Sequence, residues 1–156
     1  MSDSHVLHPD HAPTPFTADE IRAATPAGYT VVTVTEQSGA VSQRRTEFTE
    51  VDDARAVMVM TPIDDRGSPT GEARTVEAVW TDLQAHASFP AEITTVGRDT
   101  IETPLGTVEC IRYDVANDDH TNTFWFSPAH PGMPVRLTSD AKHGPTTTVV
   151  SISRPG

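Results

Sequence analysis

The residues of this chain best suited to acid–base or metal chemistry are its seven histidines. Three of them, His5, His8 and His11, recur at every third position, which is typical of a short metal-binding tract. Pro9 lies between them and opposes a helix, so the three imidazoles are not expected on one face. The tract therefore favours adventitious binding of nickel or zinc, and no structural metal site is predicted.

The other four histidines lie in segments predicted to be loops or the end of a helix. His86 is near the end of the helical segment TDLQAHA, and three fall in loops: His120, His130 and His143. Loops at one end of a barrel can bring such residues together, and Arg112 would add a cation. Solvated turn histidines, with His86 capping helix carbonyls, are the simpler interpretation. An enzyme with a site built from loop histidines and Arg112 remains an alternative.

The single cysteine, Cys110, is the one candidate thiol, and it excludes an internal disulfide. Strand alternation places it on the same side as Arg112. A reactive thiol needs a lowered pKa and access to solvent, whereas unpaired cysteines are commonly buried, so a packed, inert residue is favoured. The sequence contains no G-x-S-x-G, G-x-G-x-x-G or P-loop motif. We therefore predict no catalytic residue and no cofactor, and a non-enzymatic protein is favoured.

Two segments, residues 56–60 and 123–126, would be apolar on both faces of a strand. Antiparallel strands usually leave one face to water, so these two must be covered on both sides. The short helices, the N-terminal segment or a second subunit would provide that cover. Homodimerisation through Val57, Val59 or Trp125 is one consequence.

A ligand pocket is the other consequence of these apolar strands. Methionine adapts to varied ligands, and an apolar pocket with a few polar groups is the usual small-molecule site. The alternative is a core filled by the protein's own side chains, as in most small barrels. The residues predicted to surround an apolar ligand are Met58, Met60, Trp80, Phe124 and Phe126.

The elements that must position these residues follow from periodicity and turn signals. Thr17 and Glu20 form a capping box, with Phe16 and Ile21 as a hydrophobic staple, so a short helix should begin after Thr17. Thr81 and Gln84 occupy the same positions in a second short helix. Alternating, Val- and Thr-rich segments predict strands over residues 29–37, 41–51, 56–60, 73–80, 92–102, 107–115, 121–126, 135–138 and 146–153.

These elements predict a mainly β (α+β) domain with eight to ten strands and two short helices. Hairpin-length connections require antiparallel pairing. So many strands in one small domain must curl into a barrel or half-barrel, or stack as a sandwich. We expect a strongly curved antiparallel sheet, with Gly97 at a bulge or bend. Residues 1–15, rich in Pro, Ser, Asp and His, are expected to form a flexible tail before a single domain over residues 16–156.

Composition narrows the partners and the location. Eleven basic and 22 acidic residues leave a formal charge of −11, which repels phosphate backbones, so no nucleic-acid partner is expected. No segment approaches the roughly 18 apolar residues of a membrane span. The N-terminus has neither a basic region nor an apolar region typical of a secretory signal. Together with the single cysteine, these features predict a cytoplasmic protein.

The segments TPLGTVECIRY, FWFS and PGMPVRL resemble a bacterial domain family of unknown function. In that family, a hairpin with the same Thr-Pro and Gly is followed by strands that contain Trp and Pro-Val. The resemblance covers roughly residues 16–138 and rests on turn and strand motifs. It implies a curved antiparallel sheet similar to the half-barrels of lipoprotein-localisation factors. The leading hypothesis is a non-enzymatic domain that binds a small apolar or amphipathic ligand inside this sheet.

Overall fold

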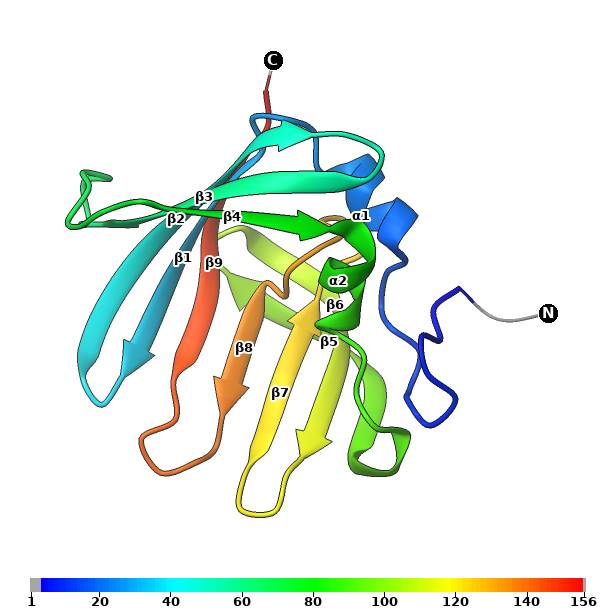
Figure 1. The fold of residues 1–156 in the computed structure, drawn as a ribbon. Helices are drawn as coiled ribbons and strands as arrows, with labels where there is room; N and C mark the ends of the chain where they lie inside the picture. Colours follow the sequence, from blue (N-terminus) through cyan, green and yellow to red (C-terminus); the bar gives the residue numbers. More distant parts are fainter. Residues whose placement is uncertain (1–3, 156) are drawn as a thin grey trace.

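The computed structural model describes residues 4–155, which form one curved antiparallel sheet with two short helices on its concave side (Figure 1). The sheet has nine strands in the order β4-β3-β2-β1-β9-β8-β7-β6-β5. The strands are β1 (Thr30–Gln37), β2 (Ala40–Val51), β3 (Arg55–Ile63), β4 (Arg74–Val79), β5 (Thr94–Thr103), β6 (Gly106–Ala116), β7 (Thr121–Phe126), β8 (Arg136–Ser139) and β9 (Thr146–Ser153). The predicted fold class is confirmed.

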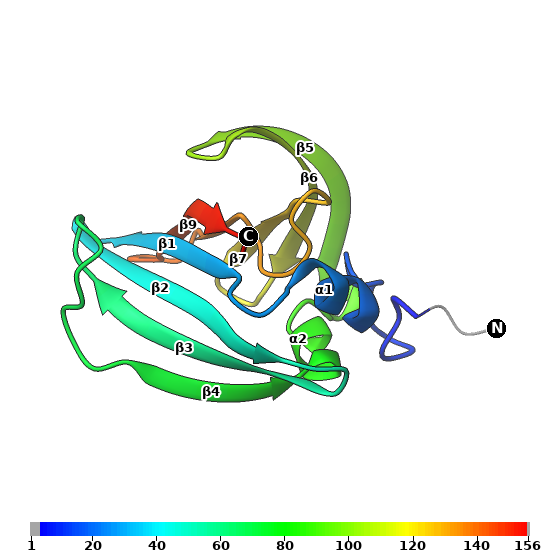
Figure 2. The ribbon, with the colours of Figure 1, turned by 90° about the horizontal axis from the view of Figure 1, so that it is seen from above.

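The sheet is an open half-barrel, because its two edge strands, β4 and β5, do not pair with each other. The register shifts in β1 at Val32/Thr33 and in β2 at Phe48/Glu50, and such irregularities increase local twist. The pairing of β5 with β6 runs past Gly97 without a shift, so of the predicted bulge or bend there is no bulge at this position. The β5–β6 hairpin is nevertheless strongly bent, as seen from above (Figure 2).

The first helix, α1 (Ala18–Ala24), begins as the sequence predicts. The Thr17 side chain accepts a bond from the Glu20 backbone N–H, and the Glu20 carboxylate accepts one from the Thr17 N–H. Phe16 and Ile21, the predicted staple pair, are both buried in the main core. The capping box therefore starts this helix while the staple ties it to the sheet.

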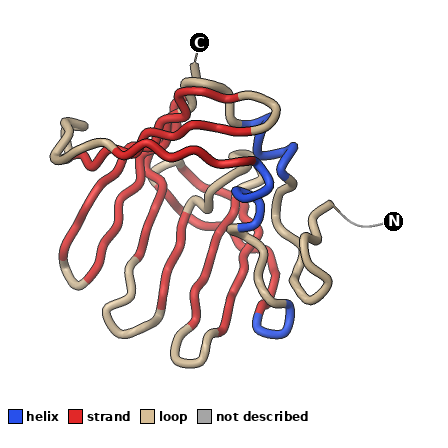
Figure 3. Tube along the Cα trace, in the orientation of Figure 1, coloured by secondary structure: helices blue, strands red, loops and turns tan. Residues whose placement is uncertain are grey.

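The second helix, α2 (Trp80–Ala85), does not begin at the predicted capping box. Its N-cap is Val79, which makes no side-chain cap bond, and Thr81 lies inside the helix. Gln84 turns inward instead, and its amide bonds to the α1 backbone at Ala18 and to Thr14. The two α-helices lie on one side of the sheet. A third helical segment, the short 3₁₀ turn η1 (Ala91–Ile93), directly precedes β5 (Figure 3).

The segment before α1, predicted as a flexible tail, makes backbone bonds to the rest of the domain. The Ala12 N–H donates to the Phe89 carbonyl, and the Tyr113 hydroxyl donates to the Pro13 carbonyl. Ala12 and Thr14 are buried. Residues 1–3 of the predicted tail lie outside the described residues. The division of the chain at residue 16 stays a prediction.

The main core lies between the concave face of the sheet and the two helices. A second, smaller core lies where the β5–β6 hairpin bends back, and it contains Val108, Cys110 and Val135 beside Trp125. Within residues 4–155, no helix has both the length and the apolar character needed to cross a membrane.

Candidate functional site

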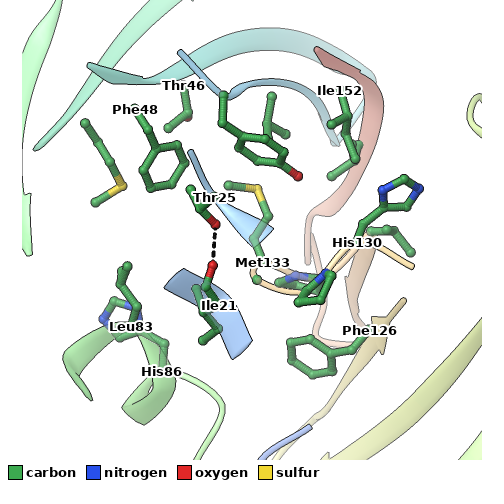
Figure 4. A pocket seen from close by; sticks show the side chains of 18 of the residues that line it. Ile21, Thr25, Thr46, Phe48, Leu83, His86, Phe126, His130, Met133 and Ile152 are labelled. Carbon is green, nitrogen blue, oxygen red and sulfur yellow. Dashed lines mark hydrogen bonds between the residues drawn. The ribbon is translucent and has the colours of Figure 1, made fainter. Parts of the chain in front are cut away.

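The concave side of the sheet encloses an apolar cavity of about 310 Å³ (Figure 4). Strand alternation builds its wall, since every second residue of a strand points to the same face. From β2 come Thr46 and Phe48, and from β7 come Phe124 and Phe126. Ile21 of α1 belongs to the opposite wall. The cavity is thus bounded by two arms of the sheet and by the helices.

Four of the five predicted ligand-binding residues line this cavity: Met58, Met60, Phe124 and Phe126. The fifth, Trp80, is buried in the core outside the cavity, and its indole N–H donates to the Asp52 carbonyl over 2.8 Å. Trp80 begins α2 instead of ending β4, which takes its side chain out of strand alternation. The assignment of the four lining residues to a ligand stays a prediction.

The loop between β7 and β8 forms a part of the cavity that strand patterning does not reveal. His130, Met133 and Val135 of this loop all line the cavity. Gly132, at φ 137°, supplies a backbone conformation that other residues rarely adopt. The signal in the sequence was an apolar methionine between prolines, PGMPV, in a segment predicted to be a loop leading into a strand.

His130 is the titratable group of this loop, and its surroundings favour the neutral imidazole. Its Nδ1 atom is buried and has no hydrogen-bond partner among residues 4–155. Burial lowers the pKa of His130, and the nearby Arg154 guanidinium lowers it further. The other histidine of the cavity lining, His86, is the C-cap residue of α2, where its backbone N–H donates to the Asp82 and Gln84 carbonyls. Capping of helix carbonyls by its imidazole, the interpretation favoured from the sequence, stays a prediction.

Tyr29 lines the cavity at the start of β1, where the C-terminal segment crosses it. Burial raises the pKa of Tyr29, while charge and hydrogen bonding from Arg154 act in the opposite direction. The Arg154 guanidinium carbon lies 5.7 Å from the centre of the Tyr29 ring. This contact brings the C-terminal segment against the lining of the cavity.

Only two of the four residues of the enzymatic alternative line the same cavity. His86 and His130 line the cavity, whereas His120 bonds to Asp119 over 2.6 Å outside it. Arg112 is also elsewhere, paired with Asp114 at 3.1 Å. No group of three or more His, Cys, Asp or Glu side chains suited to a metal occurs within residues 4–155.

The remaining chemical candidates make structural contacts. In the histidine tract, His5 bonds to the Thr14 carbonyl over 2.7 Å, and His11 bonds to Ser88 over 2.8 Å. Cys110 is buried, and burial, followed by the charge of Asp99, raises the pKa of its thiol. A raised pKa disfavours the nucleophilic thiolate.

The residues proposed for a dimer lie on the convex face of the sheet, opposite the cavity. Val57 and Val59 are half-buried there. Trp125 is occupied within the chain: its indole N–H donates to Asp99 over 3.0 Å, and the Arg112 guanidinium lies 5.4 Å from its ring.

Residues 83–151 match the model of a family described as "Protein of unknown function (DUF3108)". The resemblance to a bacterial domain family of unknown function is confirmed in this region, which contains the TPLG, FWFS and PGMPV motifs. The curated proteins include no sequence that matches the chain.

The fold is similar to that of MucB in three solved structures. The crystal structure of MucB in complex with MucA(peri) has 11% identity and a TM-score of 0.56, over 87% of this chain and 53% of that one. The complex of Pseudomonas aeruginosa MucA/MucB has 12% identity and a TM-score of 0.56, over 88% and 56%. A structure of MucB has 11% identity and a TM-score of 0.55, over 89% and 58%. This chain thus spans little more than half of each MucB chain.

The cytoplasmic location predicted from the sequence is corrected by these structures. MucB is bound in one of them to MucA(peri), and a fold shared with that complex gives no support to a cytoplasmic location. A chain with one cysteine forms no internal disulfide in either compartment. The cysteine count therefore carried no information about the location.

Proposed function

We propose that this β-rich domain is a non-enzymatic binding protein that takes one small apolar or amphipathic molecule into its concave cavity. The cavity itself is the observation that supports the proposal, because four of its lining residues are large apolar side chains: Met58, Met60, Phe124 and Phe126. Ligand sites are typically such concavities, apolar with a few polar groups. In this cavity Arg44, His86 and His130 are polar groups of that kind.

The size of the cavity limits the ligand. A volume of about 310 Å³ lies near the lower end of the range of roughly 300–1,000 Å³ for ligand sites. It corresponds to about ten water molecules at liquid density, or to a short alkyl chain. The ligand is therefore one small molecule, or one branch of a larger amphiphile.

Native mass spectrometry after mild purification tests the proposal directly. We expect a species heavier than the bare chain by the mass of one small molecule, and that mass should disappear after extraction with organic solvent. A bare-chain mass, together with an unchanged melting temperature across a panel of lipids and metabolites, would refute the proposal.

The methionines make a second test possible, because Met58, Met60 and Met133 all line the cavity. Their methyl NMR resonances should shift together as an alkyl probe such as octan-1-ol is added. Met133→Trp should fill the cavity and remove the response of the remaining two methionines. Met60→Trp serves the same purpose if Met133→Trp does not fold, because Met60 is only half-buried.

Binding of a partner polypeptide is the second candidate function. The observation that favours it is the fold shared with MucB, which is bound to MucA in two of the solved structures. The same native mass spectra separate the candidates, since a polypeptide adds thousands of daltons and a small ligand adds hundreds. A doubled chain mass would instead support the homodimer.

A further inference from the structure

Charged side chains in the arm of the sheet formed by β1–β4 are divided between its two faces. Phe48 and Met58 face the cavity, so the residues that alternate with them face outward. Glu47 is paired with the outward-facing Val59, and Glu77 with Val57. All the carboxylates of these four strands lie on this convex face: Glu36, Glu47, Glu50 and Glu77.

Two arginines lie on the opposite, concave face. Arg44 lines the cavity, and Arg74 is directly opposite Met60, another lining residue. Side chains paired in this way on antiparallel strands have Cβ atoms about 5 Å apart. Arg44 is paired with Pro62, one same-face position along β3 from Met60. Met60 is therefore flanked by two guanidinium side chains.

The guanidinium groups of Arg44 and Arg74 take no part in the polar contacts that hold residues 4–155 together. Arg44 and Arg74 are both exposed, and neither guanidinium group makes a hydrogen bond or ion pair within residues 4–155. By contrast, Arg55 on the convex face of the same arm is paired with Glu77. The cavity lining contains no Asp or Glu, although the chain has 22 of them. The concave face is thus locally cationic in a strongly acidic protein.

We propose that the ligand of the cavity is an anionic amphiphile, with its apolar part beside Met58 and Phe124 and its carboxylate or phosphate head at Arg44 and Arg74. This inference rests on the proposed function. Guanidinium groups bind both kinds of oxyanion through paired N–H donors. The formal charge of −11 repels anions at long range, but salt screens that repulsion beyond about 8 Å at physiological ionic strength. Within that distance, contact with the two arginines favours a ligand with a negatively charged head.

Three probes with one tail test this assignment: octanoate, octyl phosphate and octan-1-ol, each titrated against the methionine methyl resonances. Arg44→Gln and Arg74→Gln should each weaken the binding of octanoate or octyl phosphate by about two- to fivefold, the range for exposed charge pairs. The double variant should weaken binding further. The affinity for octan-1-ol should remain within about twofold, because its head carries no charge.

Arg66→Gln is the matched control, because Arg66 is an exposed arginine in the β3–β4 loop and its loss changes the net charge equally. Anion binding that is unchanged in the double variant, or weakened equally by Arg66→Gln, would overturn the assignment while octan-1-ol binding still supports the proposed function. If none of the three probes binds, the proposed function fails, and this inference fails with it.

Discussion

Gln84 joins three parts of the molecule, and its replacement should destabilise the fold although it lies outside the cavity. Its side chain is 3% exposed. The Oε1 atom accepts the Ala18 N–H at the start of α1 over 3.0 Å. The Nε2 atom donates to the Ser4 carbonyl over 2.8 Å and to the Thr14 hydroxyl over 3.0 Å. Gln84→Met keeps the length of the side chain and removes all three bonds.

The expected cost follows from what each partner loses. Ser4 is exposed, so water replaces its bond, and Thr14 keeps its own bond to the Phe16 carbonyl. The Ala18 N–H is left without a partner in a partly buried position, which costs about 1–3 kcal/mol. With a smaller loss at Thr14, Gln84→Met should lower the free energy of unfolding by about 2–3 kcal/mol. The corresponding fall in melting temperature is roughly 5–10 °C.

Urea unfolding measures this loss, and hydrogen exchange at the Ala18 amide locates it. The matched control is Thr81→Ala on the same helix, since Thr81 is exposed and does not cap α2. We expect Thr81→Ala to change stability by less than about 0.5 kcal/mol. A Gln84→Met chain as stable as the parent would contradict the role given to these three bonds. A loss in Thr81→Ala equal to that in Gln84→Met would show that Thr81 caps α2 after all.

Three further predictions concern the cores and the buried titratable groups. Phe126 is 2% exposed and packs on Tyr113, with 5.5 Å between the ring centres. Phe126→Ala should therefore lower the free energy of unfolding in urea by about 3–5 kcal/mol. The control, Val41→Ala at a site that is 61% exposed, should lower it by less than about 0.5 kcal/mol. Burial raises the pKa of Tyr113 to about 12, above its unfolded value of about 10. The contribution of this raised pKa to stability is therefore complete below pH ~10 and is lost as the pH rises through ~12. Ultraviolet titration of the folded chain should show Tyr113 ionising only near pH ~12. Cys110, buried with a raised pKa, should react with a thiol reagent only when the chain unfolds, and rapid labelling in native buffer would contradict this.

Local signals in the sequence were sufficient for most of the fold. The alternation of Met58 and Met60 with valines predicted β3 and its cavity face, and the Thr17–Glu20 pair predicted the start of α1. These predictions depend only on spacing within a few residues. Strand patterning and capping chemistry act over the same short range, so the sequence contains them directly.

The remaining features depend on contacts between distant segments. Thr81 and Gln84 have the spacing of a capping box, but Gln84 is taken by Ala18 and Thr14, which lie more than 60 residues earlier. Trp80 leaves the cavity because the helix begins two residues earlier than the capping box predicts. The β7–β8 loop contributes Met133 to the cavity wall, although its prolines are typical of an exposed turn. No local pattern distinguishes these outcomes.

The central claim is that the concave face of this sheet is hollow and open to an apolar guest. Crystallography under xenon pressure tests it most directly, because apolar cavities bind xenon. We expect a xenon peak within the cavity, in contact with Met58, Phe124 or Met133. Electron density in which the protein's own side chains fill this space, with no xenon there at any pressure, would contradict the claim.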